Sequence, residues 1–292
     1  MSRLSVRVAS ALLLAACACG CGRTEVRRVE WPTMGTVAAL QVKTRARAFD
    51  GERAKSVLAQ ARRACEEIVR KFDAHDATSE LCRLAPLDES AILTAASASY
   101  VCSMSVEPCY RAAFRLASAS GGAFNPRWRG QGTLDFGAIA KGFAVDVLAD
   151  CLYWDDGVEQ LVDVGGNLKC VRGTWKTGVK DPLGDGLAAT VELRAGEALA
   201  TSATYYRGSH IYDGRTGRPV TNGVASVTVR CPSALWADGL STTLFILGPE
   251  DGRVFLDREA GTLPFPREKL AVLWILDSGE IRHYGDAAAF RL

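Results

Sequence analysis

The sequence predicts an α+β or mixed α/β fold built as a single compact domain, with two interlocked lobes as the alternative. Helical periodicity dominates the first part of the chain, strand-like segments follow from about residue 160, and helical patterns return near residue 234. Strands and helices do not alternate regularly, which disfavours a doubly wound parallel sheet. No linker rich in Pro, Gly or Ser divides the chain after residue 22, so we expect residues 23–292 to fold together.

Apolar spacing predicts the helices. In residues 51–72 the apolar side chains recur at helical spacing on one side: Val57, Leu58, Ala61, Cys65, Ile68, Val69 and Phe72. A second helix is expected over residues 106–120, where Pro108 is tolerated in the first turn and Gly121 and Gly122 end it. Further helices are expected over residues 138–152, 234–247 and 249–258.

Strands are expected where the sequence alternates or carries short apolar runs bounded by turn residues. The first is TVAALQVK, residues 36–43. The others are expected over residues 160–166, 174–180, 189–194, 198–203, 225–230 and 270–276.

The composition is that of an ordinary folded protein. Of the 292 residues, 48% are hydrophobic and 23% are charged. The 35 Lys and Arg nearly cancel the 33 Asp and Glu, leaving a net charge of +2. This balance argues against a surface for a polyanion such as nucleic acid.

The N-terminus has the layout of an export signal. Arg3 and Arg7 precede the apolar run VASALLLAA, which is too short to span a bilayer. The run ends in Leu-Ala-Ala-Cys, which resembles a bacterial lipobox. This predicts a signal region over residues 1–22, lipidation at Cys17, and a membrane-anchored lipoprotein facing the periplasm or cell exterior. An ordinary signal peptide is the alternative.

Seven cysteines lie beyond residue 22: Cys65, Cys82, Cys102, Cys109, Cys151, Cys170 and Cys231. None forms a CxxC pair and no histidine stands at ligand spacing, so a zinc site is not expected. An exported protein could pair some of them, and an odd number leaves at least one over. Most are expected to be small buried hydrophobes.

The segment LDFGAIAKGFAVD, residues 134–146, is the first candidate for chemistry. A glycine-flanked turn that opens a helix presents unpaired backbone N–H groups and the positive end of the helix dipole, which suits a phosphate. Lys141 adds a full positive charge. In the alternative interpretation the glycines serve tight packing, the lysine is solvated, and Asp135 is a buried acid bonded to the turn.

Two later motifs add candidate groups. Asp238 and Thr242 are four residues apart, so on a helix they share one face, and their oxygens can hold Mg²⁺ beside a diphosphate. The alternative is an acid that complements the helix dipole. His210, in the polar turn SHIYDGRTGRPV, suits a general base, although a lone histidine is more often structural.

Taken in order, these motifs closely resemble the ApbE family of FAD:protein FMN transferases, which are often exported lipoproteins. The resemblance runs from about residue 30 to the C-terminus. It rests on MGT (34–36), SEL (79–81), SGGAFNP (120–126), LDFGAIAKGFAVD, VDVGGNL (162–168), ATSATYYRG, SHIYDGRTGRPV and ADGLSTTLFILGPEDG.

The resemblance implies an ApbE-like domain with a nucleotide site in a central cleft. It implies binding of FAD, use of Mg²⁺, and flavinylation of a threonine or serine of an acceptor protein with release of AMP. Acceptors in the family are typically subunits of membrane redox complexes. The implied FAD contacts are Met34, Ala123, Phe124, Asn125, Asp135, Lys141 and Tyr212. The implied metal ligands are Asp238, Thr242 and the backbone carbonyl of Ala138, and His210 matches the proposed base.

The chain departs from the family at several positions. Asn125 stands where the family usually has Asp, and Ser241 replaces an acid seen near the metal in some relatives. The segment 126–133 is shorter than in relatives, which puts the affinity for FAD in doubt. Two other functions stay open: an FAD diphosphate hydrolase that uses water as the nucleophile, and a flavin-binding lipoprotein without turnover.

Overall fold

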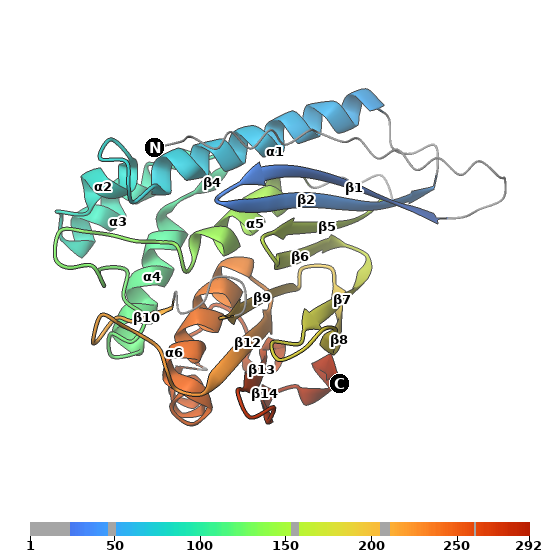
Figure 1. Cartoon of the computed structure of the whole chain (residues 1–292). Helices are drawn as coiled ribbons and strands as arrows, with labels where there is room; N and C mark the ends of the chain where they lie inside the picture. The colour runs from blue at the N-terminus through green and yellow to red at the C-terminus, as the bar shows by residue number, and fades with distance from the viewer. Residues whose placement is uncertain (1–23, 46–50, 153–157, 205–210, 260) are drawn as a thin grey trace, which may run out of the picture.

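A computed structural model describes residues 24–45, 51–152, 158–204, 211–259 and 261–292 (Figure 1). Its centre is an eight-stranded sheet in the order β1-β2-β5-β6-β9-β12-β13-β14, and every neighbouring pair is antiparallel. The strands are β1 (Thr24–Thr33), β2 (Thr36–Arg45), β5 (Glu159–Val164), β6 (Asn167–Arg172), β9 (Ala198–Ala203), β12 (Val224–Cys231), β13 (Ala271–Leu276) and β14 (Ile281–Gly285).

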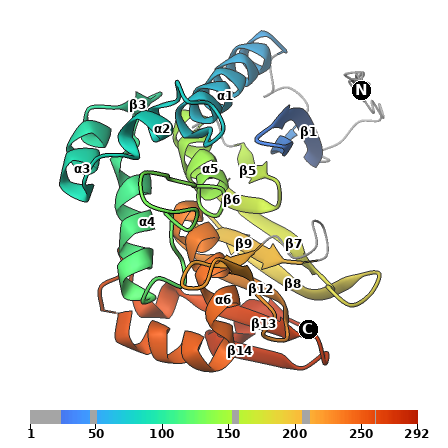
Figure 2. The ribbon, with the colours of Figure 1, turned by 60° about the vertical axis from the view of Figure 1, so that its left-hand side comes forward.

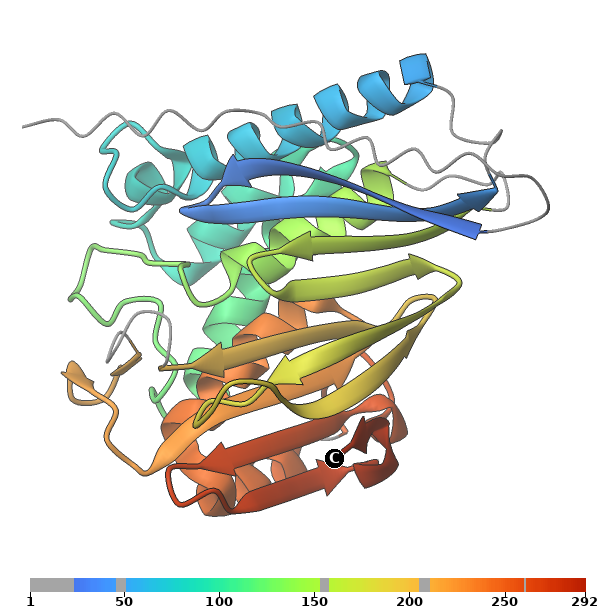
Figure 3. The ribbon, with the colours of Figure 1, turned by 45° about the vertical axis from the view of Figure 1, so that its right-hand side comes forward.

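Helices cover one face of this sheet and a small second sheet covers the other (Figures 1 and 3). The helices are α1 (Gly51–Phe72), α2 (Glu80–Leu84), α3 (Glu89–Ser97), α4 (Glu107–Ala119), α5 (Ala140–Cys151) and α6 (Ala234–Glu259). The second sheet has the order β15-β8-β7, with β7 (Thr174–Lys180), β8 (Leu187–Arg194) and β15 (Phe290–Arg291). Two small hairpins stand apart from both sheets. They are formed by β3 (Tyr100–Val101) with β4 (Met104–Ser105), and by β10 (Tyr212–Asp213) with β11 (Arg218–Pro219). The predicted α+β fold class is confirmed.

Strand β13 shows why the central sheet can be covered on both sides. Its side chains alternate, so Val272 and Trp274 join the hydrophobic cluster under the helices, whereas Leu273 and Ile275 join the cluster under the second sheet. An antiparallel strand buried on both faces reads as the continuous apolar run AVLWIL rather than as an alternation of apolar and polar residues.

The expected helices agree closely with the observed ones. Helix α1 has the predicted bounds, and Ala61, Cys65 and Ile68 on its predicted apolar side are buried, although Val69 is 37% exposed. Helix α6 is interrupted at Gly248, whose φ of 73° lies in the left-handed region. Its two halves therefore match the two helices that the sequence predicts.

Several elements were not predicted: β1, β6, β14, α2 and α3. Strand β1 is the edge of the central sheet and its sequence is rich in charge, so its hydrophobic pattern is weak. Helices α2 and α3 are short and begin at side-chain caps, Ser79 accepting from the Cys82 N–H and Asp88 from the Ala91 N–H. Within the described residues, no helix has the length and apolarity needed to cross a membrane.

One end of the central sheet collects the turns that carry the sequence motifs. The β1–β2 turn at Met34, the β5–β6 turn at Gly165 and the end of β9 all lie there (Figure 3). The Gly165 N–H donates to the Val37 carbonyl at 3.0 Å, which ties the first two turns together.

Candidate functional site

The centre of the candidate site is the contact between helices α5 and α6, which Gly142 allows to come close. A Cβ atom at position 142 would lie 2.2 Å from the Ala234 carbonyl oxygen and 2.6 Å from Cβ of Asp238. Both distances are shorter than any tolerated contact, so only glycine fits. The tight-packing interpretation of this glycine is correct, and it brings the motif at 134–146 against the motif at 237–252.

Asp238 is the carboxylate buried at this contact. Only 3% of the surface of Asp238 is exposed to solvent. One oxygen, Oδ2, accepts the backbone N–H of Gly142 at 2.8 Å, and the other, Oδ1, lies 3.4 Å from Nζ of Lys141. A buried carboxylate needs such partners, because an isolated charge away from water is costly. Lys141 is therefore paired with Asp238 rather than simply solvated.

The sequence predicts unpaired backbone N–H groups at the start of α5, and for most of this turn that prediction is wrong. The Gly137 N–H donates to Oδ1 of Asp135 at 2.9 Å, and the Gly142 N–H is taken by Asp238. The N–H groups of Ile139 and Ala140 both donate to the Phe136 carbonyl, at 3.0 and 2.8 Å. The turn satisfies these donors itself, which leaves the Lys141 ammonium as its main attraction for an anion.

Three hydroxyl groups on β9 and α6 form a linked cluster. Oγ of Ser202, at the end of β9, is 3.0 Å from Oγ1 of Thr242 and 2.9 Å from Oγ of Ser241. Ser241 in turn donates to the Asp238 carbonyl at 2.9 Å. Thr242 lies one helical turn after Asp238, as the sequence predicts, and both residues are buried. Ser202 was missed, although the Ser/Thr-rich segment that contains it had been noted.

This donor set fits a magnesium ion better than a softer metal. Oxygen is the only ligand atom available from Asp238, Thr242 and the carbonyl of half-buried Ala138. Mg²⁺ is bound through one or two carboxylates together with substrate phosphates and water. Across the described residues, no three His, Cys, Asp or Glu gather as a metal cluster. Oδ1 of Asp238 lies 3.4 Å from the Lys141 ammonium, so a metal ion bound at this oxygen would share the carboxylate with Lys141.

A second cluster surrounds Tyr212 on β10. The Tyr212 ring stacks on Trp128, with ring centroids 4.6 Å apart and an angle of 14° between the rings. Nε1 of Trp128 donates to Oδ2 of Asp135 at 3.2 Å, and Nη2 of Arg129 lies 3.3 Å from the same oxygen. Two predicted contact residues, Asp135 and Tyr212, are thus joined through a tryptophan that the sequence analysis did not single out.

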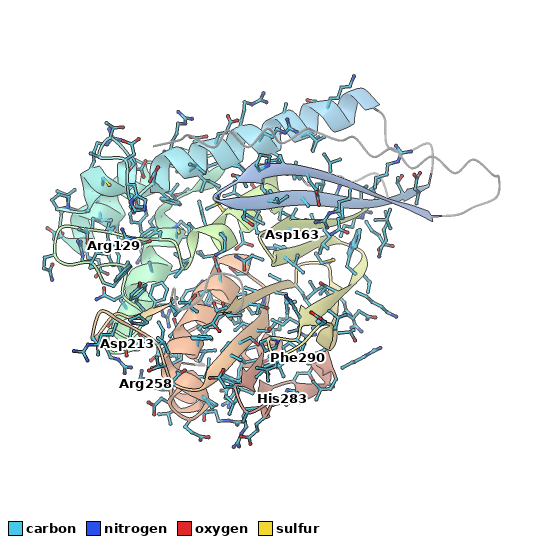
Figure 4. The ribbon with its side chains drawn as sticks, in the orientation of Figure 1. Arg129, Asp163, Asp213, Arg258, His283 and Phe290 are labelled. Carbon is cyan, nitrogen blue, oxygen red and sulfur yellow. The ribbon has the colours of Figure 1, made fainter. Side chains whose placement is uncertain are left out.

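Trp128 lies in the segment 126–133, which the sequence analysis had treated only as a shortened loop. The signal that could have found it is the aromatic residue between two arginines in RWR. Figure 4 shows Arg129 of this segment and Asp213 of the β10 hairpin at the same end of the molecule.

The hairpin of β10 and β11 is docked onto the SGGAFNP turn. The Gly214 N–H donates to the Ala123 carbonyl at 2.9 Å, and a Cβ at position 214 would lie 2.4 Å from Cβ of Asn125. Two motifs that are far apart in sequence therefore form one surface. Hydrogen bonds from Arg215 hold the pKa of Asp213 below its usual range and close the hairpin.

The remaining residues predicted to contact FAD differ in how deeply they are buried. Ala123 and Phe124 are buried in the hydrophobic core, so their side chains do not face a ligand and any contact with FAD must use backbone atoms. Asn125 is half-buried, and its Oδ1 accepts the Arg127 N–H at 2.8 Å. Met34 occupies the β1–β2 turn with a positive φ of 50° and packs on the core.

Beside Asn125 lies a surface hollow of about 510 Å³ between α3, α4 and the segment 126–133. Arg127 fixes this segment by donating to the carbonyls of Ala85 and Leu87, at 2.7 and 3.1 Å. The hollow shares Asn125 with the predicted FAD contacts; a nucleotide site in a central cleft stays a prediction.

Two predicted residues lie outside the described residues. His210 belongs to residues 205–210 and Cys17 to residues 1–23, so the base and the lipidation site stay predictions.

Part of the chain is similar in sequence to a known family and to curated proteins. Residues 127–264 match the sequence model described as the ApbE family. An FAD:protein FMN transferase of Vibrio cholerae is 37% identical over 147 residues, which are 45% of this chain and 43% of that protein. One from Escherichia coli K12 is 33% identical over 141 residues, 43% of this chain and 40% of that protein. The chain thus spans less than half the length of the curated relatives it matches.

Solved structures show the fold over a larger part of the chain. The flavin transferase ApbE from Vibrio cholerae superposes with a TM-score of 0.69 and 23% identity, covering 91% of this chain and 98% of that one. The ApbE protein of Thermotoga maritima gives a TM-score of 0.66 at 23% identity, covering 90% and 98%. This chain therefore shares its fold with these proteins.

Proposed function

We propose that this chain is an FAD:protein FMN transferase of the ApbE family, whose sequence model matches residues 127–264. The hydroxyl oxygen of a threonine or serine on an acceptor protein attacks the FMN phosphorus of FAD. The bond between the two phosphates breaks, the hydroxyl proton leaves, and AMP departs. The observation that carries the proposal is the buried Asp238 carboxylate held beside Lys141 where α5 and α6 meet.

Asp238, Thr242 and the Ala138 carbonyl are the proposed ligands of Mg²⁺. When bound, the ion would neutralise charge on the diphosphate, which otherwise repels an attacking oxygen. The Gly142 N–H fixes the orientation of the Asp238 carboxylate by holding Oδ2 and leaving Oδ1 directed toward cations. Ser202 holds the Thr242 hydroxyl from the neighbouring strand. Lys141 supplies a second positive charge for the phosphates.

His210 is the proposed general base that accepts the proton of the acceptor hydroxyl. What supports this role is its place in the sequence, two residues before Tyr212, whose hairpin is held by the hydrogen bond from Gly214 to Ala123. A positioned base contributes about 10²–10⁴-fold to such a reaction.

The flavin nucleotide is proposed to contact Met34, Asn125, Asp135, Lys141 and Tyr212, together with the backbone of Ala123 and Phe124. The stack of Trp128 on Tyr212 supports a site for a flat ring system, because aromatic faces attract other aromatic rings. Asp135 would orient the tryptophan through its hydrogen bond to Nε1.

We further propose that the mature protein begins at a lipidated Cys17, is anchored at a membrane, and faces the periplasm or cell exterior. This rests on the N-terminal sequence alone. Such an anchor would bring the enzyme to its acceptor, which we propose to be a subunit of a membrane redox complex.

The test is an assay of the chain without residues 1–22, incubated with FAD, Mg²⁺ and a candidate acceptor subunit. We expect the acceptor to gain the mass of an FMN group while AMP appears in equal amount. Free FMN with an unmodified acceptor would instead indicate an FAD diphosphate hydrolase, and FAD binding without AMP would indicate a flavin-binding protein.

A pair of histidine variants sharpens the assay. His210→Ala should lose transfer by about 10²–10⁴-fold while it still binds FAD. His75→Ala, which alters an exposed histidine outside the described cluster, is the matched control and should transfer normally. Loss of FAD binding in His210→Ala would contradict the role as a base.

A further inference from the structure

Two cysteines meet where the β3–β4 turn packs against the end of helix α5. Cys102 and Ser103 form that turn, and Asp150 and Cys151 lie in the last turn of the helix. Figure 2 labels strand β3 and helix α5. The Ser103 hydroxyl donates to Oδ2 of Asp150, and the backbone of Ser103 hydrogen-bonds the Cys151 thiol. The thiol of Cys102 lies close enough to the thiol of Cys151 to influence its pKa.

The other described thiols have different surroundings. Cys82, Cys170 and Cys231 each donate to backbone carbonyls near them in sequence. Two more, Cys65 and Cys109, are buried in the hydrophobic core, and Cys65 also lies near enough to Cys102 to interact with it electrostatically. Cys102 is exposed, which makes it accessible to a reagent in solution.

The backbone at Cys102 is unusual for a cysteine. Its φ of 53° lies in the left-handed region, which Gly, Asn and Asp tolerate better than other residues. Met34 is the other non-glycine residue with a positive φ among those described. Cys102 thus occupies a turn position that favours glycine, and a second thiol, that of Cys151, lies nearby.

We propose that Cys102 and Cys151 form a disulfide bond when the protein meets a disulfide-bearing oxidant such as oxidised glutathione. The Cys102 thiolate attacks one glutathione sulfur, the sulfur–sulfur bond breaks, and one glutathione thiolate leaves. The Cys151 thiolate then attacks the Cys102 sulfur and releases the second glutathione thiolate. The two protons lost by the protein thiols go to the two glutathiones, so the protein loses two electrons and the oxidant gains them.

The environment of the two thiols is consistent with this order. Burial, together with the neighbouring Cys102 thiol, raises the pKa of Cys151, so Cys151 is the weaker nucleophile at neutral pH. The exposed Cys102 therefore reacts first, and Cys151 completes the bond because the Ser103–Asp150 hydrogen bond holds the two segments together.

The bond would close a loop of about 50 residues that contains α4, the SGGAFNP turn and all of α5. It would also fasten the far end of the helix whose first turn holds Asp238. An oxidising compartment outside the cytoplasm, which the N-terminal sequence predicts, is where such a bond persists. The inference does not depend on the proposed transferase activity.

The test uses the full chain, reduced and then incubated with oxidised glutathione. Remaining thiols are alkylated, and peptides are identified by mass spectrometry. We expect one peptide pair joined through Cys102 and Cys151, with the loss of two hydrogen masses from the intact protein. The oxidised protein should melt roughly 5–15 °C higher than the reduced protein. The reductant dithiothreitol should abolish the difference.

Variants separate the proposed pair from the other thiols. Cys102→Ser and Cys151→Ser should each prevent the cross-link and the rise in melting temperature, whereas Cys82→Ser, a matched half-buried thiol, should keep both. Cys102 lies on an exposed turn, so its serine variant tests the inference even if Cys151→Ser folds poorly. Full alkylation of both thiols, a stable glutathione adduct on Cys102 without closure, or a bond from Cys102 to Cys65 would each overturn the proposal.

Discussion

The two halves of the candidate site are built in opposite ways. The α5–α6 contact is part of the core, where Asp238 is buried and Gly142 leaves no space for another atom. The Trp128–Tyr212 cluster lies on half-buried loops, joined by one ring stack and by hydrogen bonds to Asp135. The first half is positioned by close packing and the second by a few side-chain contacts.

This difference teaches what each half can control. A change at the α5–α6 contact that removes packing or hydrogen-bonding atoms disturbs both the fold and the proposed metal ligands, because the same atoms serve both. A change in the loop cluster removes contacts to a nucleotide without disturbing the core. We therefore expect the first half to govern turnover and stability, and the second to govern affinity.

The largest effect is expected from Asp238→Ala. Turnover should fall by at least about 10³-fold, because the site loses its one carboxylate. The free energy of unfolding should also fall, by about 1–3 kcal/mol, because the Gly142 N–H loses its acceptor.

Asp238→Asn is the matched control, since an amide oxygen can still accept from Gly142 while the charge is gone. It should lose turnover but keep most of the stability. Transfer assays and thermal melts of both variants measure the two effects. Normal turnover in Asp238→Asn would contradict the assignment of this carboxylate to the cation.

The next effect is expected from Gly142→Ala. The added Cβ would meet the Ala234 carbonyl oxygen at 2.2 Å, so the helices must separate at a cost of roughly 1–3 kcal/mol. Gly261→Ala, where a Cβ meets nothing within 4 Å, is the control and should change stability by less than about 0.5 kcal/mol. Denaturant unfolding of both variants checks this, and equal stabilities would show that the helix contact is not tight.

A smaller effect is expected from Trp128→Leu, which removes the ring stacked on Tyr212 and the hydrogen bond to Asp135. The affinity for FAD should fall by about tenfold, since an aromatic pair is worth roughly 0.5–1.5 kcal/mol beyond its buried area. Turnover at saturating FAD should change little. Titration of FAD fluorescence measures the affinity, and Trp128→Phe should restore most of it. Unchanged binding in Trp128→Leu would exclude this cluster from the nucleotide site.

The smallest effect concerns the β10 hairpin and its pH dependence. Hydrogen bonds from Arg215 lower the pKa of Asp213, so the folded state holds the charged form better than the unfolded chain does. The stabilisation is present above the unfolded pKa, near 3.9, and is lost as the pH falls through the lowered value in the folded state. Asp213→Asn should therefore cost at most about 1 kcal/mol at neutral pH.

Thermal melts at neutral and at acidic pH test this sign. The gap between Asp213→Asn and the unaltered protein should close at acidic pH, where the unaltered carboxyl is protonated. An equal difference in melting temperature at neutral and at acidic pH would show that the charge of Asp213 does not contribute to stability.

Much of the fold could be predicted from the sequence because its long elements carry strong patterns. The periodicity of residues 51–72 and the apolar run of residues 270–276 depend only on local spacing. Strand β1 could not be found this way, because a charged edge strand is held by its partner β2 rather than by its own pattern. The short helices α2 and α3 were missed because they are too short to show a clear helical period and begin at side-chain caps.

By itself, the sequence determined the long helices, most of the central strands and the residue types of the candidate site, including one face of a helix shared by Asp238 and Thr242. Only the tertiary structure decided that Lys141 pairs with Asp238, that Ser202 holds Thr242, and that Trp128 stacks on Tyr212. Spacing along the chain fixes which side chains share a face of one element. Contacts between elements depend on how closely two backbones approach, and here a missing Cβ at Gly142 sets that distance.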